Sequence, residues 1–121
     1  VNLARTVYAA LQGTRLVLLD DPVASVDNEV LRAAWEDVVL KEMRGVTRVI
    51  TVNTQLLERL LPTADRLVVV NKGRLVFNGL PSEASAHHEA ISEALGGTFD
   101  LSRKNDFSPS ASPKRVEVNG N

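Results

Sequence analysis

Apolar residues along the chain recur with two different spacings. Three stretches, residues 3–11, 28–44 and 54–61, place them at helical intervals. Two short continuous apolar runs, residues 16–19 and 48–52, lie between these stretches and are typical of strands buried on both faces. Helix and strand therefore alternate, which predicts an α/β fold with a largely parallel sheet.

The pattern changes in the second half of the chain. Residues 66–71 and 74–78 are apolar runs joined by "NKG", which predicts a β-hairpin with a tight turn. Pro81 and Ser82 then open a last helix. From residue 97 onward, Ser, Pro and Asn are frequent and apolar periodicity is weak, so residues 97–121 are predicted to form a disordered linker or tail.

Composition narrows the class of protein. The 121 residues are 44% hydrophobic and 24% charged, which is typical of a folded, soluble domain. The net charge of -1 gives no basic field to attract nucleic acid, and the chain has no cysteine for disulfides or thiolate metal sites. The first residue is a valine within a helical pattern, so we expect the chain to be part of a longer protein.

The stretch "RLVLLDDPVASVD", residues 15–27, carries the candidate chemistry. Asp20 and Asp21 follow directly after a predicted buried strand. Ligands of parallel sheets bind at the carboxyl ends of the strands, and Mg²⁺ takes one or two protein carboxylates beside water and phosphate oxygens. Asp20 is placed to hold such an ion, and Asp21 to orient or deprotonate an attacking water. The alternative is that both acids merely cap the turn into the next helix.

Several segments, taken together, resemble a known family. "LARTVY", "LVLLDD", "ASVD", "TRVITVN" and "ADRLVVVNKGRLVFNG" look like motifs of the second half of an ATP-binding cassette (ABC). In that family they are the helix after the signature loop, the Walker B strand, the D-loop, the strand before the switch residue and the closing hairpin. The similarity covers about residues 1–95 and most resembles the first cassette of a multidrug-resistance-associated (subfamily C) transporter. It implies a partial P-loop-NTPase-type parallel sheet with flanking helices over residues 1–96.

The resemblance implies a role for each matched polar residue. Asp20 takes the place of the Walker B aspartate, which binds Mg²⁺ through water, and Asp21 that of the catalytic glutamate. Asp27 closes the D-loop, which in the family contacts the opposite cassette. Asn53 falls where the switch histidine stands, although a register one residue later would place Thr54 there. ATP and Mg²⁺ are the implied cofactors, with Asp20 as the metal ligand.

The chain departs from the family pattern in two ways: two residues are altered, and two motifs are absent from the 121 residues. Asp21 is one methylene shorter than glutamate, and Asn53 cannot relay a proton as histidine can. No "GxxxxGK[ST]" phosphate loop and no signature sequence are present in the 121 residues. The resemblance therefore implies a slow-hydrolysing site within a longer transporter, and a 121-residue chain that is inactive alone.

The implied function is export of organic anions or drug conjugates, driven by ATP binding and hydrolysis at the cytosolic face of a membrane. The implied partners are a second nucleotide-binding domain and the transmembrane domains of the same transporter, with no nucleic acid. An inactive regulatory or structural cassette remnant is the alternative. A receiver domain shares the acidic pair but needs a phosphorylatable aspartate where this chain has Asn53, and cassettes of DNA repair or translation usually have "DE" at the Walker B strand.

Overall fold

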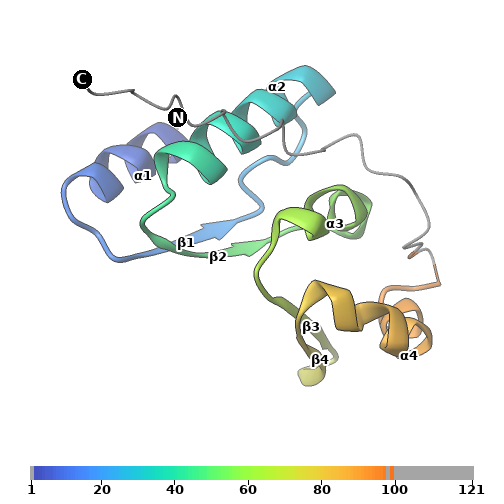
Figure 1. The fold of residues 1–121 in the computed structure, drawn as a ribbon. Coiled ribbons are helices and arrows are strands. Elements are labelled where there is room, and N and C mark those ends of the chain that lie inside the picture. Colours follow the sequence, from blue (N-terminus) through green and yellow to red (C-terminus); the bar gives the residue numbers. More distant parts are fainter. Residues whose placement is uncertain (1, 98, 100–121) are drawn as a thin grey trace, which may run out of the picture. The chain divides into compact units, whose positions relative to one another are not determined.

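The computed structural model describes residues 2–97 and 99. The chain is α/β, as predicted, and divides into two compact units, one ending at Leu57 and the other beginning at Glu58. Its elements, in chain order (Figure 1), are α1 (Asn2–Leu11), β1 (Leu16–Asp20), α2 (Asn28–Ala33), the π-helix η1 (Ala34–Glu42), β2 (Thr47–Thr51), α3 (Thr54–Leu60), the 3₁₀-helix η2 (Leu61–Thr63), β3 (Leu67–Asn71), β4 (Arg74–Gly79), the 3₁₀-helix η3 (Pro81–His87) and α4 (His88–Ala94).

The first unit is built on a parallel pair of strands. β1 pairs with β2 in continuous register from Leu16 opposite Thr47 to Asp20 opposite Thr51, which confirms the predicted parallel pairing. In Figure 1, α1 and the helix formed by α2 and η1 lie on the same side of this pair. Val17 and Leu19 of β1 are buried, and the Arg48 guanidinium of β2 donates a hydrogen bond to the Val39 carbonyl of η1.

The prediction that the two strands are buried on both faces is wrong for this chain. Alternate residues of β1 are exposed, with Leu16 at 52% and Leu18 at 71%, and Val49 of β2 is 54% exposed. Paired residues of adjacent strands share a face, so Leu18 and Val49 form one apolar exposed surface. The apolar composition of the runs is that of two-sided burial, but the described helices cover one face.

The predicted helix over residues 28–44 forms, but it changes pitch. α2 continues without interruption into η1, where the Met43 amide donates to the Val38 carbonyl, five residues back. The buried side chains recur at every fourth position: Leu31, Trp35, Val39 and Met43. A π-helix has more residues per turn than an α-helix, so this spacing stays on one side. Val30 lies outside this buried row and is 51% exposed, whereas Trp35 is buried.

The second unit contains the predicted hairpin. β3 and β4 pair antiparallel, with a bulge after Val69, and the turn residues Lys72 and Gly73 both have positive φ. Two central residues of positive φ match the right-handed twist of the strands. The inner face packs with η3 and α4 around a small core of Leu67, Val69, Phe77, Ala84 and Ile91.

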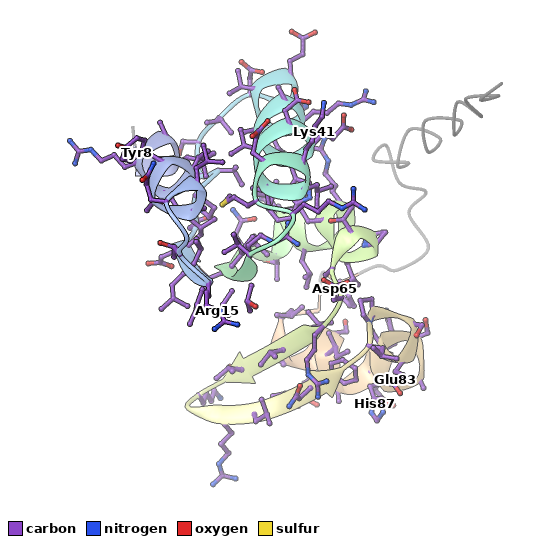
Figure 2. All side chains as sticks on the ribbon, turned by 60° about the vertical axis from the view of Figure 1, so that its left-hand side comes forward. Tyr8, Arg15, Lys41, Asp65, Glu83 and His87 are labelled. Atoms are coloured by element: carbon purple, nitrogen blue, oxygen red, sulfur yellow. The ribbon has the colours of Figure 1, made fainter. Side chains whose placement is uncertain are left out.

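The last predicted helix is a 3₁₀-helix followed by an α-helix. Glu83, labelled in Figure 2, caps the start of η3 by accepting a hydrogen bond from the Leu80 amide at 2.8 Å. His87 and His88 are exposed, and the His87 ring lies 5.2 Å from the Phe77 ring. The predicted tail lies almost entirely outside the described residues. Within residues 2–97, no helix has the length and apolar character needed to cross a membrane.

Candidate functional site

The candidate site lies where β1 and β2 end side by side. Asp20 is the last residue of β1, and its register partner is Thr51, the last residue of β2. Because the two strands are parallel, the segments that leave them start from the same edge. Asp21 leaves β1 there, and Asn53 follows β2 by two residues.

Asp20 has an exposed side chain that is held by the neighbouring strand. The Thr51 hydroxyl donates a hydrogen bond to Asp20 Oδ1, with the two oxygens 2.5 Å apart. The other carboxylate oxygen, Oδ2, has no hydrogen bond to any residue of the described part of the chain. One oxygen is thus fixed to the sheet, while the other is available to a ligand.

Asp21 has an unusual backbone conformation. Its φ of 44° lies in the left-handed region, which aspartate and asparagine tolerate better than most residues. Its amide donates to both the carbonyl and the hydroxyl of Thr51, each at 3.0 Å. Its Oδ1 is buried and has no partner among the described residues. A buried carboxylate oxygen without a donor is costly, which makes Asp21 Oδ1 a candidate contact for a cation or water.

Asn53 directly precedes α3 and caps its N-terminus. Asn53 Oδ1 accepts from the Leu56 amide at 3.1 Å, and the Asn53 carbonyl accepts from the Leu57 amide at 3.1 Å. The side-chain oxygen is therefore engaged in the helix, and the side-chain NH₂ is the group that Asn53 can offer to a ligand. Thr54, the alternative position for the switch residue, is the first residue of α3.

Asp27 has a structural contact of its own. Its Oδ1 accepts hydrogen bonds from the amides of Glu29 and Val30, at 2.9 and 3.0 Å, and so caps α2. Within residues 2–97, no hydrogen bond joins Asp27 to Asp20 or Asp21. Asp20 and Asp21 are therefore consecutive residues at the end of β1, whereas Asp27 caps the start of α2.

The donor set fits a hydrated Mg²⁺ better than an ion held wholly by protein. Two consecutive aspartates, one with an oxygen that is buried and has no partner among the described residues, meet the requirement of Mg²⁺ for one or two carboxylates beside water and phosphate. In the part of the chain that the structure describes, no group of three His, Cys, Asp or Glu side chains converges on a common point. Asp20 and Asp21 are the residues that would hold this ion, with other ligands coming from water and nucleotide.

Thr51 is the site residue that sequence reasoning missed. The sequence identifies it as a strand residue, and its contact with Asp20 depends on the register between two strands 31 residues apart. Register within a parallel pair has no local sequence signal once both strands are continuous apolar runs. The available signal was that one apolar run ends in an acid, Asp20, and the other in a threonine, Thr51.

Comparisons with known proteins find relatives among transporters. The chain is 39% identical over 103 residues, 84% of its length, to a "Multidrug resistance protein" of Leishmania tarentolae. It is 37% identical over 95 residues, 78% of its length, to human "ATP-binding cassette sub-family C member 10". It is 34% identical over 95 residues, 76% of its length, to the "Phosphonates import ATP-binding protein PhnC" of Rhizobium johnstonii.

The matched regions are small parts of these relatives. They make up 6% of the first two proteins and 32% of the third. No family model matches the chain, and no solved structure matches it.

Proposed function

The chain corresponds to part of the nucleotide-binding domain of an ABC transporter, and from this premise we propose that its β1 edge supplies the magnesium side of an ATP site. In this proposal Asp20 is the Walker B aspartate and binds hydrated Mg²⁺. When bound, the ion neutralises charge on the transferred phosphate. The observation that carries the proposal is the pair of consecutive aspartates at the carboxyl end of a parallel strand, one with a buried oxygen that has no partner in the described part of the chain.

Asp21 and Asn53 would make hydrolysis at this site slow. Asp21 occupies the position of the base that orients the attacking water, and its shorter side chain leaves it farther from that water than glutamate would be. A misplacement of about 1 Å can cost roughly a hundredfold in rate. Asn53 would offer a single NH₂ group to the terminal phosphate, because its oxygen caps α3. The site would thus bind nucleotide but hydrolyse it slowly.

The wider function rests on the relatives. Two of them carry the names "Multidrug resistance protein" and "ATP-binding cassette sub-family C member 10", which supports ATP-driven transport. The proposed cargo is organic anions or drug conjugates, moved outward. The chain would then work at the cytosolic face of a membrane, with transmembrane domains and a second nucleotide-binding domain as partners. Asp27 would lie in the D-loop and would help shape the contact with that second domain while capping α2.

A regulatory or structural cassette is the second candidate. It is favoured by the engagement of two of the four matched side chains in helix caps, since Asn53 and Asp27 both accept hydrogen bonds from backbone amides. In this case nucleotide would bind weakly or without turnover.

The direct test is Asp20→Asn in the full-length transporter that the proposal requires. The substitution should weaken binding of magnesium-ATP about tenfold or more while leaving binding of metal-free ATP unchanged, because Asp20 acts on the ion. Asp37→Asn, a matched change at an exposed position of η1, is the control and should alter neither affinity. Equal affinities for magnesium-ATP in the Asp20 variant and the parent would contradict the proposal.

A further inference from the structure

Thr51 stands between the two acids of the candidate site. Its hydroxyl oxygen lies 2.5 Å from Asp20 Oδ1 and 3.0 Å from the Asp21 amide nitrogen. Both contacts come from the last residue of β2 to the residues that end and leave β1. One hydroxyl group thus connects the side chain of one acid with the backbone of the other.

The direction of both hydrogen bonds follows from the chemistry of the groups. The Asp21 amide can only donate, so the Thr51 oxygen accepts from it. A carboxylate can only accept, so the single hydroxyl proton of Thr51 goes to Asp20 Oδ1. With its proton directed at a charged acceptor, this hydroxyl makes the shorter and stronger kind of hydrogen bond. The donor and acceptor roles of the Thr51 hydroxyl are thus both fixed, as expected for a group that holds the Asp20 side chain in one position.

Asp20 needs such a partner because little else restrains it. The side chain is exposed at a strand end, and Thr51 is the partner of its carboxylate within residues 2–97. A free aspartate side chain samples staggered rotamers about χ1. Mg²⁺ demands near-ideal octahedral geometry, so a carboxylate that moves between rotamers presents its oxygen correctly for part of the time.

We infer that Thr51 is a positioning residue, which fixes one rotamer of Asp20 so that Oδ2 faces a hydrated divalent cation. The inference rests on the proposed function, since it assigns Asp20 to the metal. Thr51 does not contact the ion. It acts through Asp20 and through the left-handed turn at Asp21, because its hydroxyl oxygen also accepts a hydrogen bond from the Asp21 amide. The opposing interpretation is that Thr51 is a strand residue whose hydroxyl merely finds the nearest acceptor.

A pair of substitutions separates the two interpretations. Thr51→Val keeps the β-branched shape and removes the hydroxyl, whereas Thr51→Ser keeps the hydroxyl and loses the methyl. Thr51 is exposed, so neither change leaves a cavity, and strand formation should be retained in both. Dispersion of the amide signals in a two-dimensional NMR spectrum of the 121-residue chain checks the fold. Thr51→Ala serves as a second hydroxyl-free variant should the valine perturb the strand.

The first measurement needs no metal. The couplings between Hα and the two Hβ protons of Asp20 should show one χ1 rotamer in the parent and in Thr51→Ser. In Thr51→Val they should shift to averaged values. Couplings that stay at single-rotamer values without the hydroxyl would overturn the inference, because Asp20 would then be held by something else.

The second measurement uses Mn²⁺ alone as the probe, since it shares the carboxylate and water preference of Mg²⁺ and broadens nearby signals. Titration should broaden the amides around Asp20 and Asp21, with a midpoint about three- to tenfold higher in Thr51→Val than in the parent or Thr51→Ser. Equal midpoints in all three chains would overturn the link between positioning and metal. If Mn²⁺ leaves Asp20 unaffected in the parent while the couplings respond to the hydroxyl, the positioning role stands and the proposed metal role of Asp20 fails.

Discussion

At Asp21 the conformation of the backbone helps to explain the identity of the side chain. The φ of 44° belongs to a region where most L-residues are strained and where aspartate and asparagine are enriched. Thr51 stabilises the turn, because its carbonyl and its hydroxyl oxygen both accept hydrogen bonds from the Asp21 amide. An aspartate at position 21 therefore has a local advantage that is independent of any catalytic role.

This local advantage makes the restoration of the family residues a test with two expected effects. In a full-length transporter, Asp21→Glu together with Asn53→His should raise turnover at this site, because glutamate reaches nearer to the attacking water and histidine adds a ring donor toward the phosphate. The same pair should lower the stability of the domain. Loss of the Asn53 cap on α3 costs about 1 kcal/mol, and glutamate at the left-handed position adds to this.

Single-site turnover, measured with the other cassette disabled, and a thermal melt give the two readouts. Asp21→Asn is the control, since it keeps the left-handed preference and removes the base. Unchanged turnover in the double variant, with nucleotide still bound, would show that the missing carboxylate reach is not what slows the site. The regulatory cassette would then be the better account.

At the level of elements, the sequence predicted type and order better than burial. The parallel pairing of β1 with β2 and the hairpin at Lys72 and Gly73 are confirmed, because apolar run length and turn chemistry are local signals. The exposed face of the strands was not predicted. An apolar residue type shows that burial is favourable, but it does not show which element covers the residue. The π-helical turn of η1 was missed because an i→i+5 pattern has no distinct sequence signature.

The alternation along β1 predicts unequal effects of the same substitution at neighbouring positions. Leu19 is 8% exposed, so Leu19→Ala should lower the free energy of unfolding by about 2–3 kcal/mol. Leu18 is 71% exposed, so Leu18→Ala should change it by no more than about 0.5 kcal/mol. Urea denaturation of the 121-residue chain followed by circular dichroism gives both values, and each variant is the control for the other. Equal losses would mean that both faces of β1 are covered in solution.

The candidate site was predictable in part. Asp20 and Asp21 could be found from sequence, because an acid pair directly after an apolar run lies at the carboxyl end of a strand. The caps made by Asp27 and Asn53 follow from the preference of these residues for helix starts, yet the sequence pattern does not tell a cap from a ligand. Thr51 could not be assigned, because its role depends on register across a parallel pair.

For the whole molecule, the decisive feature is which part of the proposed ATP site the 121 residues would supply. In the proposed function, Asp20 and Asp21 supply the metal and water side, and the 121 residues contain no "GxxxxGK[ST]" sequence to surround the phosphates with backbone amides and a lysine. The relatives that share this region are far longer, with the match making up 6% of the Leishmania and human proteins. Metal ligands without phosphate ligands hold an ion weakly and a nucleotide hardly at all.

The 121-residue chain by itself should therefore not hydrolyse ATP above the rate of buffer with Mg²⁺. Phosphate release is measured over a range of chain concentrations, since a rate that rises with the square of concentration would point to sites formed between copies. Asp20→Asn is the matched variant, because a trace contaminating ATPase would persist in it, whereas activity of the chain itself would be lost if Asp20 holds the metal as proposed. A magnesium-dependent rate in the parent that Asp20→Asn removes would show that phosphate is bound by residues other than a P-loop, and the assignment of this chain to one side of a shared site would be wrong.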